Sequence, residues 1–111
     1  MLYDDTIQES TLTEALGVTP TDPDGHGVTT IFERATAESA LRLTLRPYDD
    51  EALIELTLSS GRNATRIECR KIQNLRVGQD PQSRFLELGT SDTTITIWFY
   101  PEPRIHVLSP G

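Results

Sequence analysis

Apolar and polar residues alternate in two consecutive stretches near the middle of the chain. Leucine occupies every second position in ALRLTLRP (40–47), and isoleucine or leucine stands at 54, 56 and 58 of ALIELTLSS (52–60). A period of two is that of a β-strand with one face in a core and the other in water. The turn sequence PYDDE lies between the two stretches, so we expect them to form a hairpin.

Further strand signals follow as far as residue 108. They are ATRIECR (64–70), RFLELG (84–89), the β-branched and aromatic TTITIWFY (93–100), and RIHVL (104–108), whose flanking prolines favour a sheet edge. The alternation breaks in KIQNLRV (71–77), where we expect a bulge or a short connection, and GQDPQS (78–83) is typical of a loop. Residues 33–40 leave two alternatives open, an extended segment or a helical turn.

The N-terminal part has helical rather than strand character. Thr11 and Glu14 have capping-box spacing, and Gly17 stands where a left-handed residue would end a helix. The following VTPTDPDGHG is rich in proline and glycine and indicates a loop.

The chain of 111 residues is expected to be one domain, with residues 1–27 as a helix plus loop and residues 28–108 as a β core. The fold predicted is mainly β: an antiparallel β-sandwich or partly open barrel of six or seven short strands, with one short N-terminal helix.

Composition excludes several kinds of partner. The formal charge is −7, from 17 acidic against 10 basic residues, so the chain lacks the basic surface that nucleic-acid binding requires. No apolar run approaches the length of a membrane-spanning helix, and no secretory signal is recognisable, so we expect a cytoplasmic protein. Cys69 is the one cysteine, and its register with Ile67 places it on the inward face, where a thiol is a packing group.

One stretch, DPDGHGVTTIFE (22–33), resembles the calcium-binding loop of EF-hand proteins. Its Asp22, Asp24, Thr30 and Glu33 match loop positions one, three, nine and twelve, which supply oxygen ligands in that family. The resemblance implies a calcium ion bracing the loop.

The same stretch also fits a tight turn followed by a strand. His26 stands at position five, where calcium prefers oxygen to an imidazole nitrogen, and the sequence contains no second loop of this type. Because aspartate and glycine favour turns in any case, we expect the turn, with the calcium site as the alternative and no other cofactor.

Candidate binding residues lie near the C-terminus. In the strand predicted at 93–100, Trp98 and Tyr100 are expected on the face opposite Phe99. A strand apolar on both faces is either covered on both sides within the domain, which we favour, or presents its aromatic residues to a partner, since Trp and Tyr are typical interface anchors. His106 is expected to point away from Ile105 and Val107, at a surface or interface. No catalytic constellation is visible, so His106 or a carboxylate acting as a base in a small enzyme is a further alternative.

The favoured hypothesis is a non-catalytic domain that binds a protein partner, one that is itself basic. In size, acidity and strand content the chain resembles small bacterial immunity-type proteins that neutralise toxins. That resemblance is one of overall pattern and implies inhibition by steric blocking, helped by electrostatic steering. The oligomeric state does not follow from the sequence.

Overall fold

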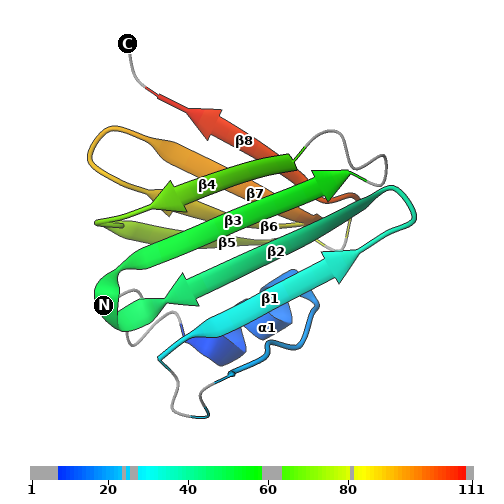
Figure 1. Ribbon diagram of the computed structural model, residues 1–111, viewed down its shortest axis with the longest axis horizontal. Coiled ribbons are helices and arrows are strands. Elements are labelled where there is room, and N and C mark those ends of the chain that lie inside the picture. The colour runs from blue at the N-terminus through cyan, green and yellow to red at the C-terminus, as the bar shows by residue number, and fades with distance from the viewer. Residues whose placement is uncertain (1–7, 24, 26–27, 59–63, 81, 110–111) are drawn as a thin grey trace.

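A computed structural model of the chain describes residues 8–23, 25, 28–58, 64–80 and 82–109. Within these residues, eight strands form two antiparallel sheets that face each other (Figure 1). Sheet A contains β1 (Thr30–Ala35), β2 (Ser39–Arg46), β3 (Glu51–Leu58) and β4 (Ala64–Cys69), and sheet B contains β5 (Asn74–Asp80), β6 (Ser83–Gly89), β7 (Thr94–Tyr100) and β8 (Arg104–Leu108). The predicted antiparallel β-sandwich with one short N-terminal helix is confirmed.

The helix α1 (Glu9–Leu16) begins earlier than its capping signal predicted. Gln8 is the N-cap and shares a capping box with Thr11, whose hydroxyl accepts a hydrogen bond from the Gln8 N–H at 3.2 Å. The C-terminal end is as expected: Gly17 has φ of 72° and donates its N–H to the Thr13 carbonyl at 3.0 Å. At eight residues, α1, the one α-helix in the described residues, is too short to cross a membrane.

The strand β5 occupies a segment for which we expected a connection and a loop. The break in alternation lies between Ile72 and Leu75, where the strand is only beginning, and its later residues Gly78 and Asp80 are types typical of turns. In the sheet, the ring of Phe85 on β6 covers this glycine so closely that a Cβ at 78 would lie 2.0 Å from a ring carbon. An aromatic ring over a cross-strand glycine restores the apolar contact that the glycine lacks, which explains how this sequence holds a strand.

The segment 33–40 contains the end of β1, a tight turn and the start of β2, and no helical turn. After β1, Thr36 closes the connection to β2, because its hydroxyl accepts hydrogen bonds from the N–H groups of Glu38 and Ser39 at 3.2 and 3.1 Å. The hydroxyl therefore satisfies the turn's backbone donors and sets the register of the hairpin.

The inward faces of both sheets share one apolar core. Its fully buried members include Phe32, Leu43, Ile54, Leu86, Leu88, Ile97 and Phe99. Leu12 and Leu16 of α1 join this cluster, and α1 packs against β5 and β6. Figure 1 shows the helix beside β1, at the side of the sandwich opposite β4 and β8. One side of the sandwich is thus covered by the helix.

A register shift in sheet B changes the orientation expected for Tyr100. Arg84 pairs with Tyr100 and Phe85 pairs with Trp98, so Phe99 has no opposite residue on β6. A bulge of this kind resets the alternation of side chains. Trp98 remains on the outer face, whereas Tyr100 packs against the core cluster. The expectation that both rings share the outer face is therefore wrong for Tyr100.

Arg34 connects the two sheets at this end of the molecule. Although Arg34 lies on β1 of sheet A, its guanidinium donates to the carbonyl oxygens of Phe99 and of Pro101, the latter at 2.9 Å. Its Cζ also lies 3.8 Å from the centroid of the Tyr100 ring. Two hydrogen bonds to backbone carbonyls and a cation–π contact hold the end of β7 to β1.

We expect Arg34→Met to lower the free energy of unfolding by about 1.5–3 kcal/mol, because charge-assisted hydrogen bonds are lost between the sheets. Arg34→Lys should lose part of this, since an ammonium lacks the planar fork. The control is Arg42→Met on the exposed face of sheet A, expected to change stability by less than about 0.5 kcal/mol. Urea unfolding measures all three, and equal effects at 34 and 42 would contradict a role for Arg34 in joining the sheets.

Candidate protein-binding surface

Two of the proposed calcium ligands lie on the strand β1, and their side chains point in opposite directions. Thr30 is fully buried and Glu33 is exposed, on opposite faces of β1. Asp22 accepts a hydrogen bond from the Gly25 N–H at 3.1 Å, as in the tight turn that we expected here, and Asp24 lies outside the described residues. Among the described residues, no three His, Cys, Asp or Glu side chains gather as a metal site would require. The calcium site stays a prediction, which would need β1 to rearrange.

The outer face of sheet B carries a row of residues that we call the aromatic row: Gly78, Phe85, Trp98 and Arg104. These residues oppose one another in register from β5 to β8. The rings of Phe85 and Trp98 have centroids 6.1 Å apart at 45°, and the Arg104 Cζ lies 4.2 Å from the Trp98 ring centroid. Tilted aromatic pairs and an arginine over tryptophan are both favourable arrangements. The rings of Phe85 and Trp98 are half-buried and Arg104 is exposed, so the row is a pre-ordered, partly apolar surface that ends in a cation.

Of the three predicted partner-binding residues, the structure places two on this face. Trp98 belongs to the aromatic row, and His106 lies in the next row, opposite Thr96. Tyr100 is separated from them by the bulge and contacts Arg34 and Arg84 instead. Sequence reasoning missed Phe85 and Arg104, because their position beside Trp98 depends on the register between strands.

The surroundings of His106 do not resemble those of a general base. The side chain is exposed on β8, and its register partner Thr96 is opposite Glu87 on β6. Glu87 is engaged elsewhere, since its carboxylate accepts a hydrogen bond from Arg76 at 2.9 Å. A base acting on a substrate needs an orienting group within hydrogen-bond reach, and the residues opposite His106 do not supply one.

The outer face of sheet A is different in character. Glu33, Arg42, Glu55 and Arg66 form a row in which acidic and basic side chains alternate from strand to strand. Opposite charges on facing strands stabilise each other modestly and suit contact with water. This alternating row has the character of a solvated surface, in contrast to the aromatic row on sheet B.

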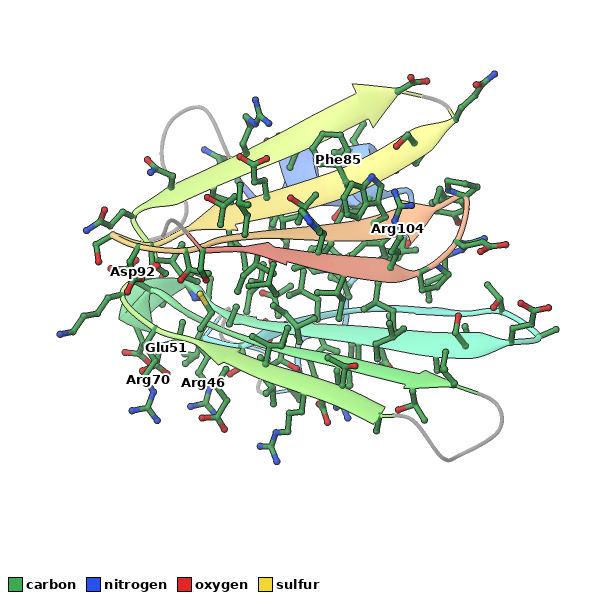
Figure 2. All side chains as sticks on the ribbon, turned by 90° about the horizontal axis from the view of Figure 1, so that it is seen from above. Arg46, Glu51, Arg70, Phe85, Asp92 and Arg104 are labelled. Carbon is green, nitrogen blue, oxygen red and sulfur yellow. The ribbon has the colours of Figure 1, made fainter. Side chains whose placement is uncertain are left out.

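A hollow of about 170 Å³ lies at one end of this face of sheet A. Arg46, Arg66, Arg70, Glu51 and Glu68 surround it, so its charges largely offset one another. Figure 2 shows Arg46 and Arg70 pointing away from sheet B. Cys69, which also borders the hollow, is buried, and its burial raises the pKa of the thiol. Since the thiolate is the reactive form, this environment makes Cys69 a poor nucleophile.

Comparison with known proteins gives a likeness of fold. No protein family matches the chain, and no curated protein matches its sequence. A chain of the contact-dependent growth inhibition toxin–immunity protein complex from Klebsiella pneumoniae 342 is similar in structure, with a TM-score of 0.77 and 10% sequence identity. The alignment covers 94% of this chain and 95% of that chain. The shared architecture therefore extends over nearly the full length of both.

We expect millimolar calcium to leave the melting temperature of the protein unchanged, because Thr30 and Glu33 cannot face the same ion from opposite sides of β1. Thermal unfolding with and without calcium, and with magnesium as the control cation, measures this. A rise in melting temperature specific to calcium, lost in Glu33→Gln, would instead establish the EF-hand-like site, since a ligand of the native state stabilises it by mass action.

Proposed function

We propose that the chain is a non-catalytic protein-binding domain of the immunity type, which inhibits a basic protein partner in the bacterial cytoplasm. The observation that carries the proposal is the likeness of fold, over nearly the whole of both chains, to a member of a toxin–immunity protein complex. A fold alone does not define a function, so the argument also rests on charge and on the surface of sheet B.

The charge of the chain favours a basic partner. With a net charge of −7, the protein attracts a basic protein over a distance comparable to the Debye length, which raises the rate of association. Inhibition then requires only that the bound domain cover a functional surface of its partner. No catalytic group of this chain takes part in that mechanism.

The aromatic row is the contact surface we propose. Tryptophan and arginine are enriched among the residues that dominate binding energies. Phe85, Trp98 and Arg104 already support one another, so little side-chain freedom is lost when a partner covers them. The outer row of sheet A alternates acidic and basic side chains instead of clustered rings, which is why we assign the partner to sheet B.

We expect expression of the chain alone to leave bacterial growth unaffected. A toxic protein encoded by the neighbouring gene should arrest growth by itself, and co-expression of this chain should restore growth through formation of a complex. The purified complex should associate more slowly as salt rises from about 0.1 M to 1 M, where the Debye length falls from about 10 Å to about 3 Å.

Two results would reject the immunity role. Growth arrest by this chain alone would assign it to the toxic partner of such a pair. Neutralisation without a stable complex would show that it acts other than by covering the toxin.

The substitution Trp98→Ala tests the contact surface. We expect it to weaken the complex by about 2 kcal/mol or more, roughly thirtyfold in Kd, as for a central interface tryptophan. The control Leu53→Ala removes a half-buried apolar side chain from the outer face of the inner strand β3 and should leave Kd unchanged. Calorimetric titration of the folded variants with the partner measures both Kd values. Weaker binding of Leu53→Ala with unchanged binding of Trp98→Ala would place the interface on sheet A instead.

A further inference from the structure

A groove of about 390 Å³ opens at the end of the sandwich where the β1–β2 and β7–β8 turns meet. Figure 1 shows both turns at the same end of the molecule, one from each sheet. Its walls come from residues 36–39, from Leu58 at the end of β3, and from Pro101, Glu102 and Pro103. Its volume lies at the small end of the roughly 300–1,000 Å³ typical of ligand pockets, which suits one side chain of a partner.

The lining of this groove combines apolar walls with two carboxylates. Leu58 is 38% exposed, and the exposed Pro101 lines the groove from the other sheet, where Pro103 is buried. Glu38 and Glu102 are both exposed, one contributed by each sheet, and no basic residue occurs among the described residues of the lining. The groove is therefore acidic and offers apolar surface beside its charges.

Both walls are fixed before any partner arrives. On the sheet A side, the Thr36 hydroxyl holds the N–H groups of Glu38 and Ser39. On the sheet B side, Arg34 of β1 holds the Pro101 carbonyl at 2.9 Å and so ties one turn to the other. Arg34 also donates to the Phe99 carbonyl and contacts the Tyr100 ring, so its guanidinium lies beneath the turn and is not part of the lining. A fixed groove loses little conformational freedom on binding.

We propose that this groove receives an arginine side chain of the basic protein partner. The inference rests on the proposed function for the partner, and on charge complementarity for the groove. Glu38 and Glu102 bind the guanidinium from two sides, while Leu58 and Pro101 pack against its methylene stem. Arginine suits this lining better than lysine, because a planar, weakly hydrated fork can meet two carboxylates and lie against apolar walls at once.

The position of the groove agrees with the contact surface on sheet B. Arg104, the last residue of the aromatic row, directly follows the turn that contains Glu102. A partner that covers Trp98 and Arg104 therefore reaches the groove without a second, separate interface.

The groove can be tested without the partner, using N-acetyl-arginine amide as the probe and backbone amide NMR shifts of the full chain as the readout. We expect saturable shifts at Ala37, Glu38, Leu58 and Glu102, with N-acetyl-lysine amide binding more weakly and N-acetyl-norleucine amide causing no such shifts. Shifts spread over all acidic surfaces, or none in the groove, would overturn the proposal.

Two double variants separate the groove from the general acidity of the protein. Glu38→Gln/Glu102→Gln and the control Glu33→Gln/Glu55→Gln both change the net charge from −7 to −5. We expect the first pair to weaken binding of the arginine probe roughly tenfold or more, since it removes the charged partners of the guanidinium, and the control pair to leave binding nearly unchanged. Equal losses in both pairs would mean long-range attraction only, and would reject the groove as a site.

The outcomes also distinguish this inference from the proposed function. Neutralisation in the growth assay, with no arginine shifts in the groove, would overturn the groove alone. Arginine binding confined to the groove, without neutralisation of a neighbouring toxin, would support the groove and overturn the immunity role.

Discussion

Burial of alternate side chains between two facing sheets is the constraint on which the rest of this structure depends. Each strand directs every second residue into one interior, so Leu43 of sheet A and Ile97 of sheet B occupy the same core. The turns, the bulge and Arg34 all act at the margins of that interior, where alternation ends and backbone carbonyls need partners. Because the inward side chains are used for packing, the side chains that can contact a partner are those at outward positions and in the turns at the ends of the strands.

Much of the fold could be predicted from the sequence, because period-two patterns depend only on local spacing. The β2–β3 hairpin, the β7 strand and the helix end at Gly17 followed directly. The strand β5 did not, because Gly78 and Asp80 are residue types typical of turns, and the glycine is compensated by Phe85, a residue on another strand. The start of α1 was also misplaced, since Gln8 rather than Thr11 is its N-cap, a choice decided by backbone geometry at the first turn.

The surface was less predictable than the core for a related reason. Trp98 and His106 could be assigned to one face by counting along their strands, but Tyr100 could not, because the bulge at Phe99 shifts the count. Phe85 and Arg104 join Trp98 only through cross-strand register, and Glu38 and Glu102 share a groove only because two turns from different sheets meet. The EF-hand-like spacing is likewise a local pattern: it treats Thr30 and Glu33 as parts of a loop, whereas in the structure they lie on opposite faces of an extended strand.

The division of each strand into inward and outward residues separates two evolutionary demands on the same chain. In β7, residues 95, 97 and 99 are buried in the core and are needed for folding. Residues 94, 96 and 98 lie on the outer face and can change with little effect on the interior. Substitutions at the outward positions can therefore change the binding surface without changing the residues that hold the core together. Such freedom would let domains of this fold differ widely in sequence while the architecture persists.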